Sequence, residues 1–219
     1  MQEISNNGVR IAYVKKGKGQ SVILIHGNGE SHELFAELIE HMANDGYTVF
    51  AADSRSHGKS DRVKRLRYSD MADDIAELIL QEEIEKPILF GFSDGGIVGL
   101  LIASKHPDML KKLIVAGINL SPKGIRPGTR AIMRIGYFFT RSDKIRLMLT
   151  QPDIKKEQLS AIQVPTVVFH AEKDIVRISG SEAVAGSVQN GKLQFIKGEN
   201  HSSYVKDNRK LYELIRQNI

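Results

Sequence analysis

The 219-residue chain contains no cysteine, and this absence excludes disulfide bonds, thiolate catalysis and cysteine-ligated zinc or iron–sulfur clusters. Only 6 residues are proline, no tract has low complexity, and 41% of the residues are apolar, which together exclude a disordered or fibrous protein. No apolar run approaches the ~20 residues that cross a bilayer, and the first residues lack the basic and apolar segments of a signal peptide. We expect a single globular domain, residues 1–219, located in the cytoplasm.

Positive charge is concentrated in one segment of the chain. The whole chain has a formal net charge of +5, and residues 121–163 alone hold nine basic and three acidic residues, a net charge of +6. A basic protein is a candidate for binding nucleic acid or an anionic membrane. Because the other residues are together nearly neutral, any electrostatic function is expected in residues 121–163. We expect no nucleic-acid partner.

Short, uninterrupted apolar runs alternate with helical patterns along the chain. Such runs are typical of strands buried on both faces of a parallel sheet, and an Asn7-Gly8 turn joins two strands before them. The alternation predicts an α/β fold with a mainly parallel sheet covered on both faces by helices. The predicted strands are 2–5, 9–14, 22–25, 48–52, 87–90, 113–115, 165–169 and 193–196, and the predicted helices are 31–44, 69–83, 94–106, 179–187 and 207–218.

The alternation is interrupted once, between the strands predicted at 113–115 and 165–169. The intervening stretch is too long for a simple loop and too short for a domain. It carries helical patterns at 129–140, 142–149 and 155–162 and coincides with the basic segment. We therefore predict a small helical cap, residues 121–163, inserted in the domain.

Residues 91–95, Gly-Phe-Ser-Asp-Gly, match the pattern G-x-S-x-G between a predicted strand and a predicted buried helix. A sharp strand-to-helix turn forces its middle residue into a strained positive-φ conformation, and flanking glycines avoid collisions between a Cβ and neighbouring backbone. Without the strand, Ser93 would be interpreted as the N-cap of the helix. In this context Ser93 is the predicted nucleophile.

A serine hydroxyl is a weak nucleophile, so it needs a base that is itself oriented by a carboxylate. Asp174 follows the strand predicted at 165–169, at the sheet edge where such folds carry their catalytic groups. Glu172 is the rival acid, and we expect it to lie in the turn. His201 follows the last predicted strand and alone among the seven histidines lies downstream of Asp174, so it is the predicted base.

The oxyanion of a tetrahedral intermediate needs hydrogen-bond donors, which are commonly two backbone N–H groups. One of them belongs to the residue after the nucleophile, here Asp94. The other comes from a loop after an earlier central strand, and residues 26–29, His-Gly-Asn-Gly, follow the strand at 22–25. We predict the N–H of Asn28 as the second donor; the alternative is that this loop is only a tight strand-to-helix turn.

Taken in order, four features resemble the α/β-hydrolase fold superfamily over essentially the whole chain: residues 26–29, residues 53–60 (Asp-Ser-Arg-Ser-His-Gly-Lys-Ser), residues 91–96, and Asp174 with His201. The resemblance implies an eight-stranded, mostly parallel sheet with one antiparallel strand near the N-terminus, a Ser-His-Asp triad and a cap after the sixth strand. Haloalkane dehalogenases and soluble epoxide hydrolases of this fold use an aspartate nucleophile, so Ser93 excludes them. The chain departs from the superfamily at Ser56, where glycine is usual, so the turn at this residue is in question.

Other motifs are incomplete. Residues 32–36, His-Glu-Leu-Phe-Ala, begin like a zinc-protease helix but have alanine where the second histidine is needed. Residues 27–32 lack the third glycine of a dinucleotide fingerprint, and no phosphate-loop pattern occurs. We expect no metal and no cofactor.

The predicted cap combines its basic residues with apolar ones. One interpretation is ordinary packing, with the apolar stripe toward the main domain and the basic face in solvent. Another is an apolar pocket with a cationic rim, which favours substrates that carry a negative charge. A role at a membrane surface is less favoured, and we expect no stable membrane insertion. The apolar residues are Ile132, Met133, Ile135, Tyr137, Phe138, Phe139, Leu147, Met148 and Leu149.

These residues predict a cofactor-independent serine hydrolase that cleaves a small carboxylic ester or thioester through an acyl-enzyme intermediate. A C–C bond hydrolase and a perhydrolase or acyltransferase of the same fold are alternatives that use the same residues. A further alternative is a ligand-binding sensor with little turnover, because fold does not imply function.

Overall fold

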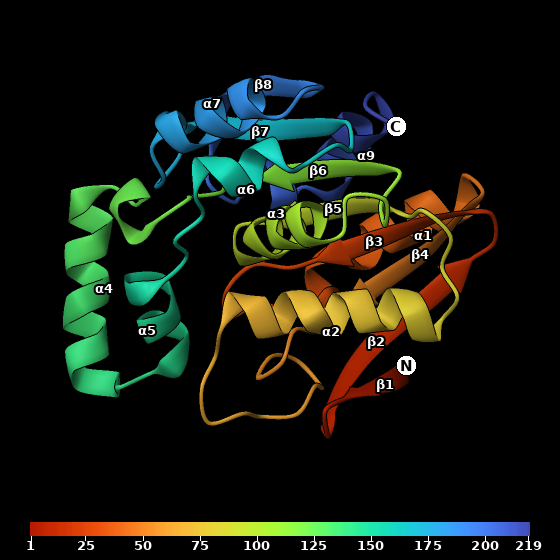
Figure 1. Ribbon diagram of the computed structural model, residues 1–219, viewed down its shortest axis with the longest axis horizontal. Helices are drawn as coiled ribbons and strands as arrows, with labels where there is room; N and C mark the ends of the chain where they lie inside the picture. Colours follow the sequence, from red (N-terminus) through yellow and green to blue (C-terminus); the bar gives the residue numbers. More distant parts are fainter.

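The computed structural model describes residues 1–219, which are built around an eight-stranded sheet in the order β1-β2-β4-β3-β5-β6-β7-β8 (Figure 1). β2 is antiparallel to β1 and β4, and all other neighbours are parallel, which confirms the predicted fold. The strands are β1 (Gln2–Asn6), β2 (Val9–Gly17), β3 (Gln20–Ile25), β4 (Tyr47–Ala52), β5 (Ile88–Phe92), β6 (Lys112–Ala116), β7 (Thr166–Lys173) and β8 (Gly191–Asn200).

The central strands are buried on both faces, as their uninterrupted apolar sequences require. Residues 22–25 of β3 are fully buried, and Leu24 lies level with Ala51 of β4 and Phe90 of β5. Since β3 and β5 run in parallel and in this register, the loops that follow them leave the sheet at the same edge.

Helices cover both faces of the sheet (Figure 1). α2, α3, α6 (Lys156–Ser160) and α7 contribute to the core on one face, and α1, α8 and α9 to the core on the other. No helix combines the length and the apolar character that a membrane crossing requires. Their bounds are α1 (Ala36–Asn44, after the 3₁₀ turn η1, His32–Phe35), α2 (Tyr68–Gln81), α3 (Asp94–Lys105), α7 (Ile178–Ser187), α8 (Ser203–Lys206) and α9 (Asn208–Arg216).

A helical segment joins β6 to β7 and lies beside the carboxyl ends of the central strands (Figure 1). It begins at the sheet edge, where Ile125 forms an antiparallel bridge with Val176. The Nε of Arg126 donates to the carbonyl oxygen of Asp174 at 2.7 Å, so the segment is tied to the end of β7. It contains η2 (Pro122–Gly124), α4 (Pro127–Thr140), α5 (Asp143–Thr150) and α6 (Lys156–Ser160).

The interpretation that the apolar stripe of this segment packs on the main domain is wrong for α4. Ile132, Ile135, Phe138 and Phe139 are 61–76% exposed, so the apolar face of the helix is turned to solvent. This face stays exposed because α4 packs on α5 and does not reach the sheet. The side that meets α5 is the one that carries Gly136.

Two glycines allow α3 to begin close to the sheet. A Cβ on Gly91 would lie 2.2 Å from the carbonyl oxygen of Gly95, and a Cβ on Gly95 would lie 2.2 Å from the carbonyl oxygen of Ile25 in β3. Both obstacles are backbone atoms, which cannot swing aside. The residue between the glycines, Ser93, has φ 52° and ψ −112°, the strained positive-φ conformation that the motif predicts.

Ser56 has a φ of 63°, so it adopts the left-handed conformation that glycine favours. Its hydroxyl accepts a hydrogen bond from the N–H of Val63 at 3.0 Å, which offsets part of the strain. The chain therefore makes this turn without the usual glycine.

Replacing Gly95 with alanine should destabilise the protein by about 2 kcal/mol or more, because the new methyl group meets the backbone of β3. Gly186→Ala is the matched control, since this glycine also lies in a helix and a Cβ there would meet nothing within 4 Å. The control should gain about 0.5–1 kcal/mol from helix propensity. Urea unfolding measures both, and equal effects of the two substitutions would contradict the close approach of α3.

Candidate active site

Ser93 lies in the turn between β5 and α3 with its hydroxyl directed at a histidine. Its N–H donates to the carbonyl oxygen of Ala116 in β6 at 2.7 Å, which fixes the turn to the neighbouring strand. Its Oγ lies 3.2 Å from Nε2 of His201, which follows β8. The predicted nucleophile and the predicted base are therefore within hydrogen-bond distance.

His201 connects Ser93 to a buried carboxylate, since its Nδ1 lies 2.6 Å from Oδ1 of Asp174. A carboxylate only accepts hydrogen bonds, so Nδ1 carries the proton and Nε2 can accept from the serine hydroxyl. The imidazole is held in place by Phe92, with ring centroids 5.1 Å apart. It also lies against Gly117, where a Cβ would come within 2.8 Å of the imidazole Cε1.

Asp174 is 2% exposed and lies directly after β7, as predicted. Burial opposes its ionisation, but the hydrogen bond from His201 and the N–H of Val176, at 3.0 Å, outweigh it. The pKa of Asp174 is therefore lower than usual, and a charged carboxylate faces the protonated Nδ1 of His201.

Glu172, the rival acid, takes no part in this arrangement. It lies within β7 and not in the turn predicted for it, because the strand continues to Lys173. Its Oε2 accepts a hydrogen bond from the N–H of Gly198 at 2.6 Å. The prediction of its position was wrong, and the preference for Asp174 agrees with the geometry.

The two predicted oxyanion donors lie at the carboxyl edge of the sheet, Asn28 in the loop after β3 and Asp94 at the start of α3. Asp94 is the first residue of α3, so its N–H has no acceptor within the helix. The N–H of Asn28 donates to no acceptor in the protein. The side chains of the two residues are joined, because Nδ2 of Asn28 donates to Oδ2 of Asp94 at 2.8 Å. Two unpaired N–H groups are thus held at this edge.

Further contacts that the sequence interpretation missed hold Asn28 and Asp94 in place. The hydroxyl of Tyr68, at the start of α2, donates to Oδ1 of Asp94 at 2.7 Å. Nδ2 of Asn28 also donates to the carbonyl oxygen of Lys144 in α5 at 3.2 Å. Burial raises the pKa of Asp94, although the hydrogen bonds from Tyr68 and Asn28 act against this. No local pattern marks Tyr68 or Lys144, since they lie 26 and 116 residues from their partners.

The sequence matches one protein family and is similar to several known proteins. Residues 20–147 match the profile of a family described as the alpha/beta hydrolase fold. The chain belongs to the alpha/beta hydrolase fold family. Its sequence is 27% identical to the serine hydrolase BPHL of Homo sapiens, over 93% of this chain and 81% of that protein. It is 24% identical to the AB hydrolase superfamily protein YisY of Bacillus subtilis, over 92% of each.

Solved structures share the fold of this alpha/beta hydrolase. Est816, described as an N-acyl homoserine lactone degrading enzyme, superposes with a TM-score of 0.85 over 100% of both chains at 20% identity. A thermophilic esterase from Thermogutta terrifontis superposes with a TM-score of 0.80 at 21% identity, over 99% of this chain and 97% of its own. The similar proteins thus include a serine hydrolase by sequence and an esterase by structure.

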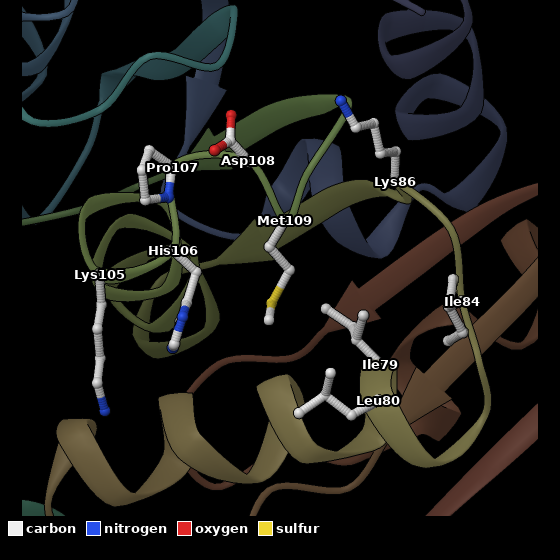
Figure 2. Close-up of a pocket in the computed structure, with 9 residues that line it drawn as sticks. All are labelled: Ile79, Leu80, Ile84, Lys86, Lys105, His106, Pro107, Asp108 and Met109. Carbon is white, nitrogen blue, oxygen red and sulfur yellow. The ribbon is translucent and has the colours of Figure 1, made fainter.

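Two cavities of the alpha/beta hydrolase are lined by residues other than Ser93, Asp174 and His201. One of about 480 Å³ lies where α2 and α3 end and β5 begins; Figure 2 shows Met109 pointing toward Ile79 across it. This is the amino-terminal edge of the sheet, opposite the edge at which such sheets bind ligands. Another, of about 490 Å³, is lined by Arg126, Pro127, Arg177 and Ile178. No group of three or more His, Asp or Glu side chains could hold a metal ion.

Two buried histidines, His26 and His57, lie at the start of the loop that follows β3 and beside it. His26 is 1% exposed, and its Nε2 accepts from the N–H of Ser54 at 3.1 Å. His57 is 2% exposed, with its ring centroid 5.1 Å from that of His26, and its Nε2 has no hydrogen-bond partner. Burial lowers the pKa of both to about 4, so both are uncharged near neutral pH.

Acidification should therefore destabilise the fold through these two histidines. Their pKa is about 4 in the folded protein, whereas an unfolded histidine binds its proton near the reference pKa of about 6.5. Between these values the unfolded state holds more protons, so the free energy of unfolding falls as the pH falls. From pH 7 to 5 the loss should be about 2 kcal/mol for each histidine.

Urea unfolding of His57→Leu at both pH values measures this effect, because the substitution removes one of these two buried imidazoles. The variant should lose about 2 kcal/mol less than the unmodified protein on acidification. His41→Gln is the control at an exposed site and should leave the pH dependence unchanged. An unaltered pH dependence in His57→Leu would contradict the account of a buried, neutral imidazole.

Proposed function

We propose that the protein is a serine hydrolase that cleaves a small carboxylic ester or thioester through an acyl-enzyme intermediate. The observation that carries the proposal is the continuous path from Ser93 Oγ to His201 Nε2, at 3.2 Å, and from His201 Nδ1 to Asp174 Oδ1, at 2.6 Å. Serine-hydrolase relatives support it. Action without a cofactor and location in the cytoplasm are predictions that rest on the sequence alone.

In the first step Ser93 Oγ attacks the substrate carbonyl while His201 Nε2 takes the hydroxyl proton. His201 then gives this proton to the leaving alcohol or thiol, and the bond between the carbonyl carbon and that group breaks. Water attacks the acyl-enzyme, His201 again takes and returns the proton, and the carboxylic acid is released. Asp174 stabilises the imidazolium that forms twice in this cycle, and its low pKa keeps it charged for that role.

The N–H groups of Asn28 and Asp94 would hold the oxyanion of both tetrahedral intermediates. Each has no acceptor in the protein, so neither must break a bond to bind the developing charge. The side-chain hydrogen bond between Asn28 and Asp94, and the one from Tyr68, keep the two loops in place. A preorganised pair of donors costs no rearrangement at the moment of reaction.

Ser93→Ala should reduce the kcat for p-nitrophenyl acetate by a factor on the order of 10⁴ to 10⁶, and His201→Ala should cost a similar amount, because the residues act as a unit. Ser202→Ala is the matched control, since this serine is adjacent to His201 but only its backbone groups take part in hydrogen bonds. Circular dichroism checks that each variant is folded. An unmodified protein that binds such esters without turning them over would support the sensor and refute the hydrolase.

We also propose that residues 121–163 form a cap that favours anionic substrates. Of its basic residues, Arg146 is engaged with Asp143 and with the carbonyl oxygen of Leu66. Lys144 is half-buried above the oxyanion loop, and burial followed by the charge of Arg62 lowers the pKa of its ammonium group. Lys144 makes no ion pair with an acidic residue, and its carbonyl oxygen contacts Asn28, so it is the cap residue best placed to attract a negative charge to the site.

For an ester that carries a carboxylate, Lys144→Gln should lower kcat/KM by about tenfold at low salt, and salt should weaken the preference in the unmodified protein. A neutral ester of similar size should respond to neither change. Lys156→Gln, at an exposed position of the same segment, is the control. Identical responses of the two esters to Lys144→Gln and to salt would overturn the charge preference.

A further inference from the structure

Helix α4 exposes four large apolar side chains on one face. Ile132, Ile135, Phe138 and Phe139 are 71%, 61%, 65% and 76% exposed, respectively. They follow helical spacing and therefore form one stripe, the α4 apolar face. The rings of Phe138 and Phe139 meet edge to face with centroids 5.2 Å apart, which makes this end of the stripe continuous.

The α4 apolar face has no covering element within the chain. α4 packs on α5, and α5 lies between α4 and the rest of the molecule (Figure 1). No residue of α4 is buried. Contiguous exposed apolar surface of this kind in a soluble protein marks an interaction site, because leaving it in water is unfavourable.

The charge around this face is of one sign. α4 contains no acidic residue, and it carries Arg130 and Arg134, with Arg126 and Arg141 at its two ends. Arg134 and Arg141 are exposed and form no ion pair with any acidic side chain. The Arg141 guanidinium lies over the rings of Tyr137 and Phe138, at 5.8 and 5.6 Å, so cation and aromatic groups share one surface.

We propose that the α4 apolar face docks on the surface of a lipid bilayer that contains anionic headgroups. An amphipathic helix with aromatic and aliphatic residues on one face and arginines on its flanks lies in the plane of the interface, with its apolar face below the headgroups. The arginines would bind lipid phosphates, and these phosphates supply the negative charge that α4 itself lacks. The docking is peripheral and reversible, in keeping with helices that cannot span a membrane.

A second copy of the chain fits this surface less well. Two copies that met through the α4 apolar face would bring Arg134 and Arg141 of each close to those of the other, with no carboxylate on either helix to pair with them. Like charges at an interface oppose association. Self-association through this face would therefore contradict docking on a bilayer.

The chain contains no tryptophan, so a single introduced one reports its own surroundings. Phe139→Trp places the reporter on the α4 apolar face, and Phe195→Trp, at a 51% exposed aromatic position on β8, is the matched control. With vesicles of phosphatidylcholine and phosphatidylglycerol in equal parts, the emission of Phe139→Trp should shift to shorter wavelength and be quenched by brominated lipid. The control should not change, and neither should respond to vesicles of phosphatidylcholine alone.

Vesicle flotation of the full chain provides the second measurement. Phe138→Ser with Phe139→Ser should weaken binding to the anionic vesicles by about tenfold or more. Arg134→Gln with Arg141→Gln should weaken it on the order of tenfold, and added salt should do the same. All four positions are exposed, so the variants should fold, and Phe195→Ser should bind as the unmodified protein does.

Unchanged emission of Phe139→Trp with anionic vesicles would overturn the proposal, as would flotation that the Phe138 and Phe139 substitutions leave intact. Dimers in sedimentation velocity that these substitutions abolish, without vesicle binding, would also overturn it in favour of self-association. Turnover of a neutral ester without vesicles serves as an independent readout, because α4 contributes no residue to the Ser93, His201 and Asp174 arrangement or to the proposed oxyanion donors. Loss of docking and failure of the hydrolase proposal are thereby distinguishable.

Discussion

The backbone at Ser93 holds its strained positive-φ conformation because α3 approaches strands β3 and β5 with no side chain between them. Gly91 and Gly95 make this contact possible, and any Cβ at either position would meet backbone atoms. The approach fixes the Ser93 hydroxyl at the carboxyl edge of the sheet, where parallel register also brings the loops after β3 and β7. Asp174 and His201 lie at that same edge, directly after β7 and β8. The geometry of the site therefore depends on the close packing of α3 against β3 and β5.

A second set of contacts ties the helical segment between β6 and β7 to this turn. The carboxyl group of Asp94 accepts hydrogen bonds from Tyr68 and Asn28, and Asn28 also binds the carbonyl oxygen of Lys144. Arg126 adds a bond to the carbonyl oxygen of Asp174. The segment is thus connected both to Asn28 and to Asp174. A shift of α5 would therefore displace the loop that carries Asn28.

The sequence was sufficient to predict the sheet, its flanking helices and the meeting of Ser93, Asp174 and His201, because each depends on a local pattern and a shared sheet edge. It did not predict the orientation of α4. An apolar stripe shows that a helix has an apolar and a polar face, but it does not show which of them packs against the rest of the protein. Glu172 was misplaced because apolar periodicity ends before the hydrogen bonding of β7 does. The contacts of Tyr68 with Asp94 and of Lys144 with Asn28 were not predicted, because they join residues far apart in the chain.

The central claim is that Ser93 is the activated nucleophile, held at the sheet edge by the turn and deprotonated by His201. The most direct measurement is peptide mapping by mass spectrometry after reaction of the unmodified protein with a fluorophosphonate. The account predicts a single adduct, on Ser93, which forms far more slowly in the absence of the His201 imidazole. An adduct on another serine, or equally fast labelling of Ser93 without that imidazole, would contradict it.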